Sequence, residues 1–138
     1  MKVVLDTNVW LSAIVWRGEA TKIIDARINR EVEIIITKEI LSEIVDILNR
    51  TRFKEFIENK QEKIEDLIRV ILSISTFIET KTKLDVVKKD PKDNIILEAG
   101  LDAKVDYLIS YDDHLINMIE FNRIKILTPT EFLKLIKS

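Results

Sequence analysis

The sequence predicts an α/β fold in which helices cover both faces of a parallel sheet. Three observations predict it. Short β-branched runs alternate with segments whose apolar residues recur every three or four positions. The chain has only 2 Gly and 2 Pro in 138 residues, which leaves little room for long irregular loops. A carboxylate directly follows the first strand-like run, at the edge where parallel sheets bind ligands.

The first part of the chain reads as strand–helix units. Residues 2–6 form an apolar run that predicts a buried strand. A helix is expected over 7–16, where Arg17-Gly18 interrupts the pattern, and the next over 19–29. The β-branched run 33–36 predicts the second strand.

Longer helices follow. Thr37 is placed to cap a helix over 38–50, whose apolar residues share one face. A short helix is expected over 51–59 and a long one over 61–77, and 77–81 is expected to be a short strand.

The last third repeats the alternation. Asp90 and Pro91 suit the cap and first residue of a helix that continues to 104. Strands are then expected over 107–110 and 124–127, and helices over 114–120 and 129–137.

The composition excludes several kinds of site. The absence of Cys excludes disulfides, zinc–thiolate sites, iron–sulfur clusters and a cysteine nucleophile. With 22 basic and 24 acidic residues, the formal charge of −2 argues against duplex binding through a large basic face. No signal peptide and no apolar run of about 18 residues is visible, so we expect a cytoplasmic protein without a membrane span. We expect residues 1–138 to form one domain.

Two acids follow predicted strands. Asp6 comes directly after the first strand, and Asp112 comes shortly after 107–110. Each could simply cap the helix behind it, and either Asp112 or Asp113 is expected to do so. Capping leaves carboxylate oxygens for other ligands, and the strand-end position favours Asp112 over Asp113 as the site acid. Ser110 or Asp113 would support it.

Two further acids project from helices. Glu43 lies at the border of the apolar face of 38–50, half-buried, while Glu39 and Asp46 lie further toward solvent. Asp93 projects into the apolar stripe of its helix, where an unpaired charge is costly. Asp93 could instead complete a capping box with Asp90. Four carboxylates converging on one crevice repel each other unless a cation binds, so the constellation predicts a divalent-metal site.

The remaining polar and aromatic candidates are weaker. His114 is the single histidine, and surface exposure is a more common state for it than a role as general base. Trp10 and Trp16 suit a core or an interface better than base stacking. Basic residues expected near the crevice, with a collective role in phosphate contact, are Arg17, Arg50, Arg52, Lys88, Lys89 and Lys92.

The order of these acids resembles that of PIN domains, in particular the toxin components of toxin–antitoxin systems (VapC-like). The resemblance covers essentially the whole chain and rests on five segments. These are 4–9, 37–43, 90–94, 108–112 and 126–132, of which the first four contain Asp6, Glu43, Asp93 and Asp112. Two residues depart from the family pattern: Tyr111 replaces a usually small residue, and His114 replaces a frequent Asp.

The resemblance implies a three-layer α/β/α fold with a parallel sheet of about five strands. It also implies a Mg²⁺- or Mn²⁺-dependent endoribonuclease, in which Asp6, Glu43, Asp93 and Asp112 are the catalytic residues and metal ligands. The metal would lower the pKa of a bound water for attack on the scissile phosphate. Supporting positions around these ligands are Thr7, Asn8, Ser110 and Asp113.

Partners follow from the same resemblance. RNA is the implied substrate, although metal-directed water attack does not require the 2′-hydroxyl and leaves DNA open. A cognate antitoxin protein is implied for a toxin of this kind. Family members commonly form homodimers, for which Trp10, Ile14 and Trp16 could supply apolar surface.

Three other readings compete. A haloacid-dehalogenase-type phosphatase requires a second acid at position 8, where this chain has Asn8. A response-regulator receiver requires paired acids after the first strand, which are also absent. A non-catalytic PIN-like module that binds RNA or protein remains the alternative function, and the presence of all four acids argues against it.

Overall fold

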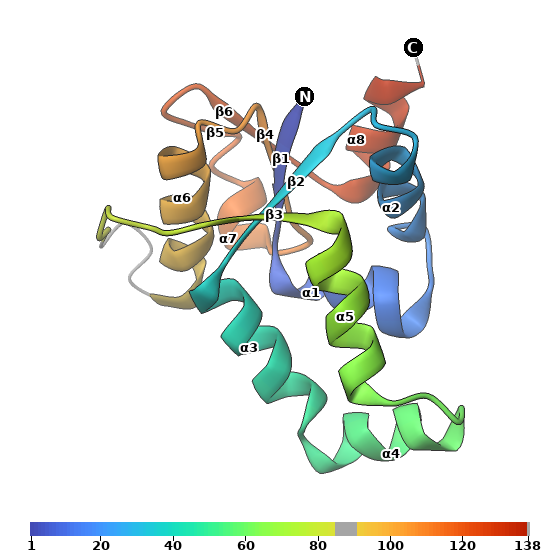
Figure 1. Ribbon diagram of the computed structural model, residues 1–138. Helices are drawn as coiled ribbons and strands as arrows, with labels where there is room; N and C mark the ends of the chain where they lie inside the picture. Colours follow the sequence, from blue (N-terminus) through green and yellow to red (C-terminus); the bar gives the residue numbers. More distant parts are fainter. Residues whose placement is uncertain (85–90, 138) are drawn as a thin grey trace.

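A six-stranded sheet forms the centre of the computed structural model, which describes residues 1–84 and 91–137 (Figure 1). Its strand order is β3-β2-β1-β4-β6-β5, and every neighbouring pair is parallel except β5 with β6. The strands are β1 (Lys2–Leu5), β2 (Glu33–Thr37), β3 (Ser75–Ile78), β4 (Tyr107–Ile109), β5 (Glu120–Phe121) and β6 (Ile124–Leu127). The five predicted parallel strands are therefore confirmed. The sixth, β5, has only two residues at the sheet edge, too few to produce an alternating pattern.

Helices cover both faces of the sheet, as predicted. The α-helices are α1 (Thr7–Leu11), α2 (Thr21–Ile28), α3 (Lys38–Leu48), α4 (Thr51–Asn59), α5 (Ile64–Ile74), α6 (Pro91–Ala103), α7 (Asp113–Ile116) and α8 (Pro129–Ile136), and η1 (Ser12–Trp16) is a π-helix. Figure 1 shows α6 on one side of the sheet and α2 and α8 on the other. None of the helices in the described ranges is long and apolar enough to cross a membrane.

Three predicted helices differ from the structure. The segment 7–16 divides into α1 and the wider π-helix η1, which ends at Arg17 with a left-handed φ of 54°. The helix predicted over 61–77 stops at Ile74, because Ser75 adopts extended backbone and begins β3 two residues before its predicted start at 77. The helix predicted over 114–120 is the single turn α7, since Ile119 takes a φ of 66° before β5.

The central strand β1 is buried, and α6 packs against it. Val3, Val4 and Leu5 are completely buried. On one face α6 approaches closely at Gly100, where an added Cβ would lie 3.2 Å from Ile124 Cδ1 and 3.8 Å from Val4 Cγ1. The chain passes from β1 to β2 and β3 on one side of β1 and then crosses to β4 on its other side, so the strand order reverses at β1. Ligands of open α/β sheets bind beyond the strand ends at such a switch point.

Candidate metal centre

Asp6 occupies the turn between β1 and α1, at the switch point of the sheet. Its side chain is only 8% exposed, and both oxygens accept hydrogen bonds. Oδ1 accepts from the backbone N–H of Thr7 at 2.7 Å, which caps α1, and Oδ2 accepts from Ser110 Oγ at 2.7 Å. The backbone N–H of Asp6 donates to Ile109 O at 2.9 Å, so the ends of β1 and β4 are held together. Asp6 therefore caps α1 and also lies at the carboxyl end of β1, beside β4.

Ser110 connects this acid to the one after β4. Its side chain is completely buried, and its Oγ accepts from the backbone N–H of Asp112 at 2.9 Å while donating to Asp6. The supporting position predicted for Ser110 is thus occupied by a hydroxyl that contacts both strand-end segments. A single side chain fixes the distance between two of the four predicted site acids.

Asp112 is half-buried and caps the short helix α7. Its Oδ1 accepts from the backbone N–H of His114 at 2.8 Å and lies 3.2 Å from His114 Nδ1. The prediction that one of the two adjacent aspartates caps this helix is confirmed, with Asp112 in that role. Asp113 is exposed at the first position of α7.

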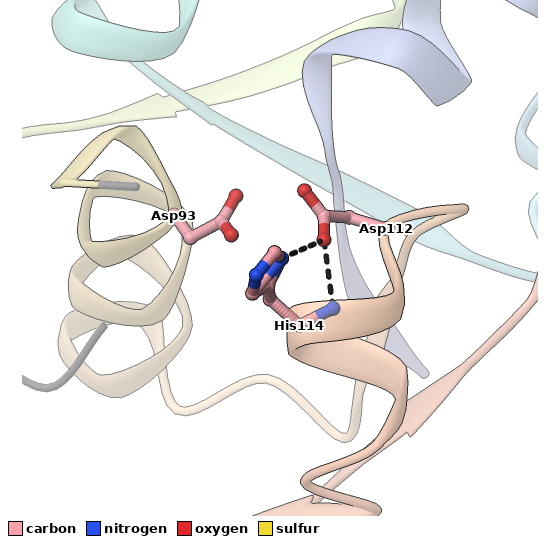
Figure 2. A group of neighbouring side chains, drawn as sticks. All are labelled: Asp93, Asp112 and His114. Carbon is pink, nitrogen blue, oxygen red and sulfur yellow. Dashed lines mark hydrogen bonds and ion pairs between the residues drawn. The ribbon is translucent and has the colours of Figure 1, made fainter. Parts of the chain in front are cut away.

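Asp93 brings a third carboxylate to the same place from α6. It is 4% exposed, which confirms the prediction that it points toward the interior. One ligand atom each from Asp93, Asp112 and His114 lies within 4.8 Å of the other two, and Figure 2 shows the imidazole beside both carboxylates. The alternative explanation, a capping box with Asp90, lies outside the described residues.

Glu43 lies on α3, half-buried as predicted. It lines a cavity of about 480 Å³ together with the basic side chains of Lys38, Arg50 and Lys92. Glu39, predicted to be solvated, also lies there half-buried and accepts a hydrogen bond from Thr80 Oγ1 at 3.3 Å. Glu43 does not belong to the Asp93–Asp112–His114 group within the described residues, but it affects Asp6 electrostatically.

Three of the four acids, Asp6, Glu43 and Asp112, interact electrostatically. Burial raises the pKa of Asp6 above its ordinary value of 3.8, opposed by the hydrogen bonds from Ser110 and Thr7. The negative charges of Glu43 and Asp112 raise that pKa further. Carboxylate oxygens are the donors that Mg²⁺ and Mn²⁺ prefer, and a cation would offset this mutual repulsion. The donor set therefore fits a divalent metal.

Comparison with known proteins agrees with this arrangement. Residues 2–114 match the family model described as PIN domain. The chain belongs to the PIN-domain family. An uncharacterised protein of Methanocaldococcus jannaschii is 27% identical over 143 residues, covering 97% of this chain and 90% of that protein. The solved structure of VapBC2 from Rickettsia felis, bound to a DNA fragment from their promoter, has a TM-score of 0.63. It is 12% identical and covers 91% of this chain and 97% of that one, so this likeness supports the fold.

The other supporting residues of this PIN domain take different positions. Thr7 is 3% exposed, and its Oγ1 is buried without a hydrogen-bond partner in the described part of the chain. A buried hydroxyl beside Asp6 is suited to orienting a water or a substrate oxygen. Asn8, in contrast, is exposed.

The predicted basic residues divide into separate groups. Arg50 and Lys92 line the cavity beside Glu43. Arg17 instead forms an ion pair with Glu62 at 2.8 Å. Arg52 lines a different cavity, of about 270 Å³, with Trp16 and Phe53. Lys88 and Lys89 lie outside the described residues.

The apolar surface suggested for a homodimer is mostly internal. Trp10 is completely buried and Ile14 is 5% exposed, so the prediction that they could supply an interface is wrong. Both side chains belong to the core beneath α1 and η1. Trp16 is 50% exposed and packs against Phe53 and Phe56 of α4.

Sequence reasoning missed the contacts of two polar residues, His114 and Glu98. His114 was expected at the surface, where its side chain is 48% exposed, yet it also reaches Asp93 and Asp112. Its position two residues after a strand-end acid was the available signal. Glu98 is 6% exposed on α6 and accepts from the backbone N–H of Leu84 at 2.9 Å. Its neighbours along the helix gave no indication of that contact.

Proposed function

We propose that this PIN domain is a Mg²⁺- or Mn²⁺-dependent endoribonuclease that hydrolyses RNA phosphodiester bonds. The observation that carries the proposal is the meeting of buried and half-buried carboxylates at the switch point of the sheet. One ligand atom of Asp93 lies within 4.8 Å of one of Asp112. The negative charges of Asp112 and Glu43 raise the pKa of Asp6. Membership of the PIN-domain family supports the same activity.

Asp6, Glu43, Asp93 and Asp112 would hold the metal. A divalent cation bound by them supplies a water of lowered pKa and neutralises charge on the scissile phosphate. The chain's own contribution is to position these carboxylates. Ser110 and the Thr7 N–H hold both oxygens of Asp6, and α7 holds Asp112 through its capping bond. Hydrogen-bond donors of this kind, which do not touch the ion themselves, keep the ligands in the orientation that metal binding requires.

The RNA backbone would enter beside Glu43. Arg50 and Lys92 line the cavity there with Lys38, and the acids Glu39, Glu43 and Asp46 line it too, so the cations would contact phosphates while the acids face the metal side. Phosphate contacts of this kind position a nucleic acid without reading its sequence.

We further propose that the protein is the toxin of a toxin–antitoxin pair and binds a cognate antitoxin. The fold of VapBC2 from Rickettsia felis, which was solved with promoter DNA, supports this assignment. A homodimer would use the exposed Trp16 together with Phe53 and Phe56. Because the proposed substrate is cellular RNA, we place the protein in the cytoplasm.

The domain would extend through the whole chain. The family model ends at residue 114, yet β6 pairs with β4, and Phe132 of α8 is completely buried against Tyr107, with ring centroids 5.8 Å apart. These contacts support one domain over residues 1–138.

Cleavage of labelled RNAs by the purified protein tests the activity. We expect cutting with Mn²⁺ or Mg²⁺, none with EDTA, and loss of cutting in Asp6→Asn. Asp25→Asn is the control, because Asp25 is exposed on α2 and its replacement removes the same charge. Equal cutting by Asp6→Asn would indicate a contaminating nuclease. Binding of RNA without any cutting would favour the non-catalytic module.

A further inference from the structure

We infer that His114 is a nitrogen ligand of the metal site, and that it shifts the preference of this PIN domain from Mg²⁺ toward Co²⁺, Ni²⁺ and Zn²⁺. The inference rests on the proposed function, because it concerns the same carboxylates. It goes beyond that function by adding a donor of different chemistry and by predicting which ions bind.

The geometry that carries the inference is the group of Asp93, Asp112 and His114. Each offers one ligand atom within 4.8 Å of the other two, a separation that one ion can span. Asp93 comes from α6, His114 from α7 and Asp112 from the cap before α7, and the three side chains converge on one place (Figure 2). The imidazole is thus a neighbour of two proposed ligands.

The contact with Asp112 orients the ring for this role. His114 Nδ1 lies 3.2 Å from Asp112 Oδ1, and the backbone N–H of His114 donates to the same oxygen at 2.8 Å. The tautomer with its proton on Nδ1 would donate to the Asp112 carboxylate and leave the lone pair of Nε2 for a metal ion. A histidine held through one nitrogen by a carboxylate is a common arrangement in metal sites. Asp112 Oδ2 receives neither of these two bonds.

A mixed nitrogen and oxygen donor set changes the selectivity. Mg²⁺ is a hard ion that prefers oxygen ligands, whereas imidazole suits the later divalent ions of the first transition row. A site with carboxylates alone would favour Mg²⁺ and Mn²⁺ over the ions that prefer nitrogen ligands. Adding His114 should therefore raise the affinity for Co²⁺, Ni²⁺ and Zn²⁺ relative to Mg²⁺.

Metal binding to the whole protein, measured without any substrate, tests the inference. The variant His114→Asp replaces the imidazole with a carboxylate, and Glu120→Gln, an exposed position on β5, is the control. We expect the ratio of Co²⁺ to Mg²⁺ affinity to fall about ten- to hundredfold in His114→Asp, by the size of effect that ligand-shell changes produce. Glu120→Gln should keep the wild-type ratio. Far-ultraviolet circular dichroism and the melting temperature in EDTA report whether His114→Asp folds.

A spectroscopic measurement identifies the donor directly. Pulsed electron paramagnetic resonance of bound Mn²⁺ should detect coupling to a ¹⁴N nucleus in the wild type and lose it in His114→Asp and His114→Ala. Saturable Mn²⁺ binding without ¹⁴N coupling in the wild type would overturn the role of His114 and leave the carboxylate site intact. Absence of saturable binding for every divalent ion tested would overturn the proposed function as well.

Discussion

Ser110 Oγ donates a 2.7 Å hydrogen bond to Asp6 Oδ2 across the switch point of the sheet. The same oxygen accepts the backbone N–H of Asp112, so one buried hydroxyl sets the relative positions of two proposed metal ligands. The proposed metal centre would therefore depend on a residue that carries no charge and need not touch the ion.

Replacing Ser110 with Ala should therefore weaken the site from outside the ligand set. We expect about a ten- to hundredfold loss of metal affinity or cleavage rate, the usual cost of removing a group that orients ligands. The matched control is Ser75→Ala. Ser75 lies on β3, away from the acids, and the substitution removes a hydroxyl that donates to Ile71 O. Titration of Mn²⁺ by calorimetry measures the loss. Equal affinities of the two variants would contradict the role given to Ser110.

The raised pKa of Asp6 predicts how stability depends on pH in the absence of metal. Because the folded protein holds this proton more tightly than the unfolded chain, the contribution is fully present below pH 3.8. It is lost as the pH rises through the higher folded-state pKa. Glu43 and Asp112, the charged groups facing Asp6, increase the effect. In EDTA, the free energy of unfolding of Asp6→Asn minus that of wild type should increase with pH from about 3.8 upward.

Asp102 provides a control of opposite sign. Hydrogen bonds from Thr82 lower the pKa of Asp102, so its contribution is present above pH 3.8 and is lost as the pH falls through the folded-state pKa. The difference between Asp102→Asn and wild type should therefore decrease with rising pH. Urea unfolding across a pH series measures both differences. Parallel pH profiles for the two variants would contradict the assignment for Asp6.

Divalent metal should raise the melting temperature of the wild-type protein. A ligand that binds only the folded state, at about a hundred times its dissociation constant, adds about 2.7 kcal/mol to the free energy of unfolding. Relief of repulsion among Asp6, Glu43 and Asp112 contributes to that binding. Differential scanning calorimetry with Mn²⁺ and with EDTA measures the rise. It should disappear in Asp112→Asn and persist in Asp25→Asn.

Arg50 should contribute to RNA affinity through a phosphate contact. In a non-cleaving background such as Asp93→Asn, Arg50→Ala should reduce the salt dependence of binding to single-stranded RNA. The slope of log affinity against log salt should change by about 0.7, the value for one lost contact. Arg69→Ala is the control, since Arg69 is exposed on α5 and pairs with Asp66. An unchanged slope for Arg50→Ala would place the RNA elsewhere.

The sequence predicts an element well when its residues carry a repeated or local signal, and poorly when they carry none. The apolar faces of α3 and α5 repeat over 11 residues each, so their periodicity is visible in the sequence. The parallel strands are short, and their β-branched composition indicates them. Thr37 and Thr128 act as side-chain caps at the starts of α3 and α8, a local signal that marks helix starts. The two-residue strand β5 and the left-handed turn at Ile119 have no such repeat.

Site residues divide in the same way. Asp6 and Asp112 follow strands directly, and Asp93 lies on an apolar stripe, so position alone indicates that they face the crevice or the interior. Whether two side chains meet depends on tertiary packing that no local pattern encodes. The approach of His114 to Asp93, and the ion pair that draws Arg17 to Glu62, are of this kind. For the same reason the sequence does not decide whether Trp10 lies in the core or at an interface, and the packing of α1 buries it.

Asp93→Asn provides the most direct test of the central claim, that the converging carboxylates make this PIN domain a metal-dependent nuclease. Cleavage and binding of the same labelled RNA would be measured with Mn²⁺ for wild type, Asp93→Asn and the same-helix control Asp102→Asn. We predict that Asp93→Asn abolishes cleavage while retaining RNA binding, and that Asp102→Asn retains both. Cleavage by Asp93→Asn at the wild-type rate would contradict the claim.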